Sequence, residues 1–331
     1  MRFVRLDPAP GFMGFGVLTP VGMGVAGLLD AGVSDAPVGV AVPSDLAVLD
    51  GEPVQRLHRL DRYGALGCAA ALAALADAGV ALAEQVDPDW GVTIGSCLGC
   101  GTSSVRYHLD RCDKPAAELS PALFVRTVSN AVSGDISMAC RLGGASETLV
   151  SGWAAGAEAM GSAGAALTEG RARFMLAGGV EAPDARVEEM HAAFRRDADL
   201  PWLPQRLSEG AAIAVMGLDG RAAWPDALRL RAYGRSHDPA GRFSLAGALD
   251  ALRPLRFRST LIANRIPPDL LARWRVEAGS MEIFSLPRRA GELGAAGAPV
   301  AVAVAAARRL ESVLVIARGV EGGTVALALG R

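Results

Sequence analysis

One stretch of this sequence limits the possible folds more than any other. Residues 148–159 read TLVSGWAAGAEA, in which an apolar run ends at a glycine and a segment rich in alanine and glycine follows. This pattern predicts a β-strand that turns sharply into a helix. The small side chains allow that helix to lie close against a sheet, while one large residue, Trp153, stands at the turn.

The composition of the chain agrees with closely packed helices and sheets. Of the 331 residues, 51% are hydrophobic, only 5% are aromatic, and 40 are glycine. A disordered chain or a small disulfide-stapled domain has a different composition. Strand and helix patterns alternate twice along the sequence, which predicts an α/β protein built from two stacked βα halves. We place these halves at residues 1–218 and 219–331.

Charge and cysteine content exclude several classes of function. The formal net charge is −2, so no overall field favours nucleic acid or acidic membranes, and neither is an expected partner. Residues 1–7 are too polar for a secretory signal, so we expect reduced cysteines and a cytoplasmic location. The CxxC pair at Cys97 and Cys100 lacks a second pair at zinc spacing, so we expect no metal site.

Two other segments have a simple structural interpretation. The glycine-rich segment 11–22 reads as a strand end running into a turn, and no acidic residue follows that could hold a ribose, so no cofactor is expected. Residues 290–307 are mostly alanine and valine, but they are short for a membrane span and contain Glu292 and Pro299. This segment predicts a buried helix.

Local patterns predict the remaining elements, with residues 30–55 expected to form a loop. We expect helices at residues 62–78, 101–112, 121–136, 154–169, 244–252 and 268–274, and from about residue 294. Asp61 is expected to cap the first of them. We expect strands at residues 90–95, 174–181, 207–216, 228–236, 259–263, 312–318 and 324–329.

Several of these segments match the motifs of one enzyme family in the family's own order. They read GFMGFGVLTPVG at 11–22, TLVSGWAAGAEA at 148–159, FMLAGGVE at 174–181, LSEGAAIAVM at 207–216 and GELGAAG at 291–297, followed by a closing hairpin. The chain thereby resembles the β-ketoacyl synthases, and in particular the type II polyketide ketosynthase-like subunits of the thiolase superfamily. The resemblance implies two pseudo-duplicated halves stacked in α/β/α/β/α layers, with the second half trimmed.

The resemblance also assigns the positions that carry catalysis in active family members. Those enzymes use a cysteine nucleophile and two histidines, and the matching positions here are Trp153, Asn264 and Glu292. An indole offers neither a nucleophile nor a useful base. The resemblance thus implies a catalytic site without its catalytic residues. The histidines of the chain fall outside these motifs: His58, His108, His191 and His237.

Glu292 lies in a segment of small residues, where a lone carboxylate would be costly to bury. We therefore expect it to meet an arginine, which could be Arg288, Arg289 or one from a partner chain.

Ketosynthase-like subunits that lack the cysteine resemble chain-length factors. The resemblance implies a heterodimer with a catalytic ketosynthase subunit, in which residues at the interface limit the length of the growing acyl chain, and contact with acyl carrier protein through the complex. The candidate tunnel-end and interface residues are Val105, His108, Leu109, Cys112, Phe124 and Val128. Ordinary interface or core packing explains each of them equally well.

Two other functions stay open at this point. One is a stand-alone enzyme that transfers or decarboxylates acyl groups with other residues, and the other is a scaffold that stabilises a partner or recruits acyl carrier protein. Familiar chain-length factors carry glutamine where this chain has Trp153, so a divergent branch, such as those making polyenes, is one candidate. The cluster of Arg253, Arg256 and Arg258 suits an acidic carrier protein, although a solvated charged face explains it as well.

Overall fold

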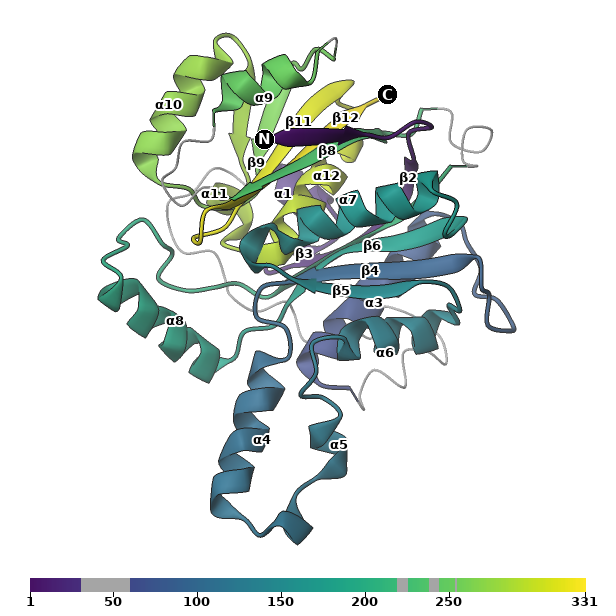
Figure 1. Cartoon of the computed structure of the whole chain (residues 1–331), viewed down its shortest axis with the longest axis vertical. Coiled ribbons are helices and arrows are strands. Elements are labelled where there is room, and N and C mark those ends of the chain that lie inside the picture. Colours follow the sequence, from purple (N-terminus) through teal and green to yellow (C-terminus); the bar gives the residue numbers. More distant parts are fainter. Residues whose placement is uncertain (31–59, 219–225, 238–243, 254) are drawn as a thin grey trace.

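The strands of the protein form one continuous sheet that serves both halves of the chain. The computed structural model describes residues 1–30, 60–218, 226–237, 244–253 and 255–331. Within this described part the sheet has 12 strands. Figure 1 shows it folded into two layers, with helices between them and on both outer faces.

The first half of the chain contributes five strands in the order β2-β7-β6-β4-β5. They are β2 (Gly11–Thr19), β4 (Trp90–Ser96), β5 (Ser146–Val150), β6 (Phe174–Glu181) and β7 (Gly210–Gly217). The helices of this half are α1 (Ala26–Asp30), α3 (Arg62–Asp77), α4 (Gly101–Asp113), α5 (Pro121–Phe124), α6 (Ala131–Cys140), α7 (Ala155–Thr168) and α8 (Ala185–Asp197). A two-residue strand, β3 (Gly22–Met23), pairs with the end of β2.

The second half contributes five strands in the order β8-β12-β11-β9-β10. They are β8 (Arg229–His237), β9 (Ser259–Ile262), β10 (Glu282–Ser285), β11 (Ser312–Arg318) and β12 (Gly323–Gly330). The helices are α9 (Leu245–Ala251), α10 (Pro268–Ala278), α11 (Pro287–Ala290) and α12 (Gly297–Ala307). The N-terminal strand β1 (Arg2–Arg5) pairs with β8.

The two halves repeat one topology. In each half, the strands counted along the chain lie in the order first, fifth, fourth, second, third, and the fifth strand is antiparallel to both of its neighbours. The halves join where Gly11 of β2 pairs with Arg229 of β8. The division at residue 218 stays a prediction, and this repeat is the observation that supports it.

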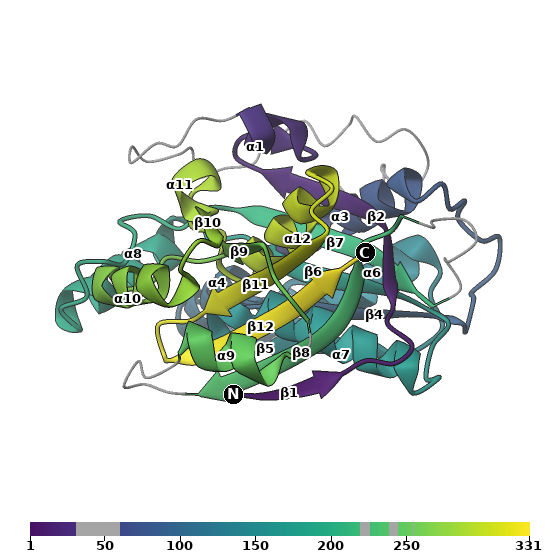
Figure 2. The same ribbon diagram turned by 90° about the horizontal axis from the view of Figure 1, so that it is seen from above.

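Alternating side chains divide the core into separate layers. On β11, Val313 and Val315 face the core between the two layers of the sheet. Leu314 and Ile316 face the outer helices α9 and α10. The same alternation on β7 separates the central core from the outer face covered by α3 and α6. Helices α7 and α12 fill the central layer, as the views in Figures 1 and 2 show. The predicted α/β/α/β/α arrangement is confirmed.

Most of the predicted elements are present, but one helix and two strands differ from the prediction. The expected helix at 121–136 is two helices, α5 and α6, because the backbone bonds after α5 close shorter turns: the amides of Arg126 and Thr127 donate to the carbonyls of Leu123 and Phe124, each at 3.0 Å. Segment 11–22 is mainly the nine-residue strand β2 rather than a strand end and turn. Strand β7 begins at Gly210, not at residue 207. The loop predicted at 30–55 lies almost entirely outside the described residues.

The glycines of β2 serve packing rather than turning. A Cβ atom at Gly16 would lie 1.8 Å from the carbonyl oxygen of Ala70, so α3 touches the strand backbone directly. The start of α3 is fixed by Asp61, whose side chain accepts a hydrogen bond from the Gly64 amide at 2.9 Å. The predicted cap at Asp61 is confirmed.

Helix α12 is short and buried on nearly all sides. It has 11 residues, and its side chains from Gly297 to Ala303 are all buried in the core. The expectation of a buried helix is therefore confirmed. None of the helices in the described ranges has the length and hydropathy needed to cross a bilayer.

Candidate functional site

The two central helices begin at the same place in the molecule. Strand β5 leads through a short 3-10 turn, η3 (Gly152–Ala154), into α7, and α12 begins with a matching turn, η5 (Gly294–Ala296). Each turn opens with a glycine of positive φ, +76° at Gly152 and +52° at Gly294. A Cβ atom at Gly156 would lie 1.9 Å from the carbonyl oxygen of Ala295, so the two helix starts touch backbone to backbone.

Trp153 lies in the η3 turn between strand β5 and helix α7, as the sequence predicts. Its side chain is only 4% exposed and packs against Leu203 and Leu207. Cys97 and Val320 are among the partly buried residues that complete this cluster. The indole therefore fills the space between the start of α7, the loop after α8 and the β11–β12 hairpin.

Asn264 and Glu292, the other two positions derived from the resemblance, are joined directly. The Nδ2 group of Asn264 donates to the Glu292 carboxylate at 2.9 Å and to the Gly294 carbonyl at 2.8 Å. The backbone amides of Arg265 and Gly294 also donate to Glu292, at 2.7 and 3.1 Å. Both side chains are about 1% exposed. The sequence thus identified two residues that meet in the core although 28 positions separate them.

The expected contact between Glu292 and Arg289 is absent, whereas a contact with an arginine of a partner chain stays a prediction. Glu292 accepts hydrogen bonds from one side-chain amide and two backbone amides. The Arg289 guanidinium donates to the carbonyl of Leu28 at 3.4 Å. The side chain of Arg288 lies outside the described part of the structure. Three N–H donors satisfy a buried carboxylate without a full countercharge.

A second buried carboxylate, that of Glu181 at the end of β6, was not predicted from the sequence. It accepts hydrogen bonds from the Leu98 amide at 3.2 Å, the Ser96 hydroxyl at 3.3 Å and the Ala295 amide at 3.2 Å, and also from the Cys97 amide. Its position as the last residue of the motif FMLAGGVE was the only signal in the sequence. The partners lie up to 114 positions away, so spacing could not reveal the contact.

These two carboxylates flank the start of α12. Burial raises the pKa of Glu181 and of Glu292 from 4.5 to about 7, while the surrounding hydrogen bonds act in the opposite direction. The adjacent amides of Gly294 and Ala295 each donate to one of them. The positive end of the α12 dipole also favours negative charge here.

Cys97 brings a thiol to this centre, but not a reactive one. Burial raises the pKa of the Cys97 thiol well above its usual range, and the carboxylates of Glu181, Glu321 and Glu292 raise it further. The thiolate is the nucleophilic form of cysteine, so this environment makes the side chain inert.

The described histidines lie on other elements. His108 is on α4, His191 is on α8 with its Nε2 atom 3.0 Å from the carbonyl of Pro204, and His237 ends β8. His58 falls outside the described residues. In the described ranges no group of three or more His, Cys, Asp or Glu side chains is arranged to hold a metal ion.

A cavity of about 390 Å³ lies beside Asn264. Its lining includes Trp202, Ile266, Leu271 and the guanidinium-bearing Arg265. The Oδ1 atom of Asn264 is buried and accepts no hydrogen bond from the described part of the chain. A cavity and a buried polar atom, Oδ1 of Asn264, therefore lie next to the centre. The amide, carboxylates and indole of the centre supply no activated nucleophile.

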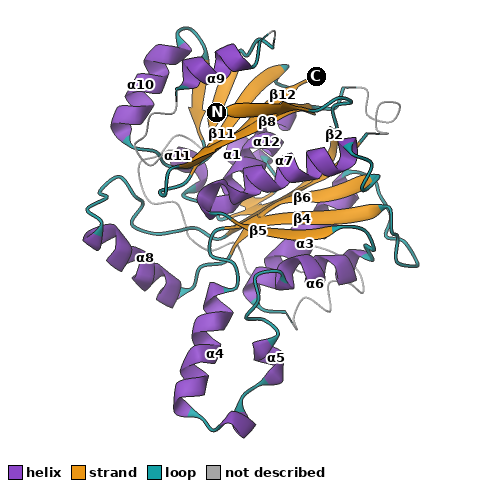
Figure 3. Ribbon diagram, viewed as in Figure 1, coloured by secondary structure: helices purple, strands orange, loops and turns teal. Residues whose placement is uncertain are grey.

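The tunnel-end candidates lie away from this centre, on an arm formed by α4 and α5 and the residues that follow. Figures 1 and 3 show the arm projecting from the layered body. Tyr107 and Phe124 hold the two helices together, with ring centroids 5.4 Å apart. Val105 is half-buried, and the other candidates are exposed: His108, Leu109, Cys112, Phe124 and Val128.

Comparison with known proteins identifies the fold. Residues 47–196 match the family described as beta-ketoacyl synthase, N-terminal domain. The chain has the thiolase-like ketosynthase fold. The curated 3-oxoacyl-(acyl-carrier-protein) synthase 2 of Rhizobium meliloti (strain 1021) is 32% identical over 137 residues, which is 41% of this chain and 32% of that protein. The Vibrio harveyi protein of the same name is 29% identical over 124 residues, covering 38% and 30%.

The match therefore spans about a third of the length of each curated relative. Similar solved structures align with nearly the whole of this chain. One, described as the AntDE:AntF complex of a type II PKS acyl-carrier protein with its ketosynthase bound to the hexaketide, aligns with a TM-score of 0.78 at 16% identity, over 99% of both chains. The ishigamide ketosynthase/chain length factor aligns at 0.75 and 20% identity, over 97% of this chain and 99% of that one. A beta-ketoacyl synthase from Burkholderia phymatum STM815 aligns at 0.74 and 18%, over 98% and 99%.

Proposed function

We propose that this chain is a non-catalytic ketosynthase-like subunit of the chain-length-factor type. In this proposal it pairs with a catalytic ketosynthase, and side chains on its α4–α5 arm help to end the tunnel in which the partner extends an acyl chain on acyl carrier protein. The proposed mechanism is steric: extension stops when the growing chain meets those side chains.

The observation that carries the proposal is the chemistry of the centre at the start of α7 and α12. Trp153 occupies the strand-to-helix turn, and the Asn264–Glu292 pair lies at the start of the second central helix. If these are the positions of the family's cysteine and two histidines, the centre lacks a nucleophile and a base. A Claisen condensation requires both a nucleophile and stabilisation of the developing charge.

A partner is supported by apolar side chains left uncovered on one region of the first half. Leu109 is 40% exposed, Phe124 55% and Val128 50% on the arm, and Met138 of α6 is 70% exposed. Val150, at the end of β5, is 51% exposed. Strand β5 lies at the edge of the sheet and pairs only with β4 among the described strands. An open strand edge beside exposed apolar residues is typical of a protein–protein interface.

Two of the similar structures favour the same assignment over a general scaffold. One is described as a ketosynthase with its acyl-carrier protein, and the other as a ketosynthase/chain length factor. Their sequence identity to this chain is 16% and 20%. They therefore support the proposal only through the fold that they share with this chain.

Co-expression with a cysteine-containing ketosynthase from the same cluster of genes tests the proposal. We expect a stoichiometric complex that condenses malonyl groups, and no condensation by this chain alone. Replacing Leu109 with the smaller alanine should lengthen the products, and replacing it with tryptophan should shorten them. Val276→Ala is the matched control, because Val276 is 81% exposed on α10 of the other half.

Other outcomes would contradict the proposal in distinguishable ways. Turnover of acyl thioesters by the purified chain alone would indicate a stand-alone enzyme. A complex whose product length does not respond to Leu109, Phe124 or Val128 substitutions would indicate a scaffold.

A further inference from the structure

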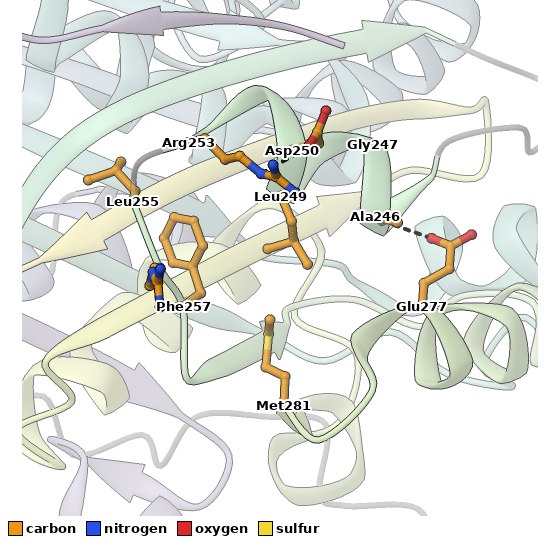
Figure 4. A pocket seen from close by; sticks show the side chains of 10 residues that line it. Ala246, Gly247, Leu249, Asp250, Arg253, Leu255, Phe257, Glu277 and Met281 are labelled. Carbon is orange, nitrogen blue, oxygen red and sulfur yellow. Dashed lines mark hydrogen bonds and ion pairs between the residues drawn. The ribbon is translucent and has the colours of Figure 1, made fainter.

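A wide hollow lies on the outer face of the second half, across the sheet from α12. It has a volume of about 1060 Å³ and lies between α9, α10 and the segment leading into β9. Figure 4 shows Leu249, Phe257 and Met281 directed toward one another across it. These side chains and Leu255 are only half-buried, so the hollow offers apolar surface that is still in contact with water. Small-molecule sites have volumes of about 300–1,000 Å³, so this hollow is at least as large as the largest of them.

Most of the charges around the hollow are already paired. Asp250 and Arg253 form an ion pair at 3.0 Å. Glu277 accepts from the Ala246 amide at 3.0 Å and the Ser244 hydroxyl at 3.2 Å, and it also pairs with Arg273 at 3.6 Å. Figure 4 marks the contact between Ala246 and Glu277.

Arg256 is the charged residue that remains. Its exposed guanidinium makes no hydrogen bond or ion pair with the described part of the chain, whereas the next arginine, Arg258, pairs with Glu311 at 3.7 Å. The lining of the hollow therefore combines an apolar floor with one uncompensated positive charge. That combination is complementary to a molecule with one apolar chain and one negative charge.

We propose that this hollow is a binding site for a single-chain aliphatic carboxylate, with the chain on Leu249, Leu255, Phe257 and Met281 and the carboxylate on Arg256. A guanidinium can bind a carboxylate through two parallel N–H donors. The site is separate from the centre near Trp153, because the second-half sheet lies between them. The inference goes beyond the chain-length role and does not depend on it.

Calorimetric titration of the full chain with sodium decanoate tests the site. We expect saturable binding of one decanoate per chain. Decan-1-ol, which has the same tail without the charge, should bind about tenfold more weakly, and acetate, which has the charge without the tail, should not bind. The monodecanoyl ester of glycerol phosphate carries a phosphate head group, and tighter binding of this compound would overturn the assignment to a carboxylate.

Two matched pairs of variants locate the binding. Arg256→Gln should weaken decanoate binding about tenfold, whereas Arg258→Gln should leave it unchanged. Leu249→Gln should weaken binding as well, whereas Val276→Gln, at an exposed position outside the hollow, should not. Thermal melting of each variant confirms that the fold is retained.

Three further results would overturn the proposal. The first is no binding of decanoate. The second is equal binding by the wild type, Arg256→Gln and Leu249→Gln, which would mean adsorption elsewhere on the chain. The third is a concentration-dependent dimer that Leu249→Gln abolishes, because the hollow would then be covered by a second copy of the chain.

Discussion

The side-chain amide of Asn264 donates to the carboxylate of Glu292 at 2.9 Å, and both residues are buried at the start of α12. If the family resemblance assigns these positions correctly, an amide–carboxylate pair stands where active relatives carry two imidazoles. The pair holds together the turn that leads into the central helix. It therefore gives these positions a structural role that can be measured without any assay of catalysis.

Removing the Asn264 amide should weaken the fold. Asn264→Ala leaves Glu292 with two backbone donors, and we expect the free energy of unfolding to fall by about 1–3 kcal/mol. Urea denaturation measures the change. Asn130→Ala is the control, because Asn130 is exposed and its side chain makes no cap bond, and it should change stability by less than about 0.5 kcal/mol. Equal stability of the two variants would show that the amide contributes nothing to the turn.

The two buried glutamates should make stability depend on pH. Their pKa values are about 7 in the folded chain and near 4.5 when unfolded, so the unfolded state loses their protons first. The stabilising contribution is therefore complete below about pH 4.5 and is lost as the pH rises through 7. We expect the free energy of unfolding to decline over this window.

The variant Glu292→Gln separates this effect from other titrating groups. It cannot lose a proton, so its stability should decline less steeply between pH 5 and 8 than that of the wild type. Urea denaturation at several pH values gives both slopes. Glu321→Gln serves as the comparison, because Glu321 is an exposed glutamate in the turn between β11 and β12. Parallel curves for the wild type and Glu292→Gln would contradict the prediction.

Trp153 should be needed for stability rather than for reaction. Trp153→Ala removes a buried indole from its cluster with Leu203 and Leu207, and we expect a loss of about 3–5 kcal/mol in the free energy of unfolding. Val276→Ala, at an exposed position on α10, should change the stability of the isolated chain by less than about 0.5 kcal/mol. A fully stable Trp153→Ala chain would mean that the indole does not fill the core.

The backbone at the start of α7 should require glycine. Gly152 has a φ of +76°, and a Cβ atom there would lie 2.4 Å from the Glu321 carboxylate, so Gly152→Ala should cost about 1–2 kcal/mol or more. Gly134→Ala is the opposite control, since a Cβ atom in helix α6 meets nothing within 4 Å. This variant should gain about 0.4–1 kcal/mol. Thermal or urea denaturation distinguishes the two, and a tolerated Gly152→Ala would refute the requirement.

Local patterns predicted the central features of the fold. The turn at Trp153, the cap at Asp61 and the buried helix α12 each depend on nearby residues, and each is present. The segment 11–22 was misread because glycine permits both a turn and a close approach of another backbone. Only the position of α3 shows that Gly14 and Gly16 allow the close approach of another backbone.

The candidate site was only partly predictable, because its contacts join distant parts of the chain. The family motif pointed to Asn264 and Glu292 separately, but their hydrogen bond depends on how β9 and α12 are placed by the sheet. Glu181 and Cys97 come together through the parallel pairing of β4 with β6, which no local spacing encodes. The interruption between α5 and α6 was missed because it consists of two shorter backbone turns at Arg126 and Thr127, and no glycine or proline marks it in the sequence.

The contact between Gly156 and Ala295 has a consequence for how such a protein can change over time. Main-chain atoms make this contact between the two halves. The contact therefore does not depend on which side chains lie next to it. Reactive groups there could be exchanged one after another while the architecture persists. A chain built in this way can keep its outline while the side chains beside this contact change.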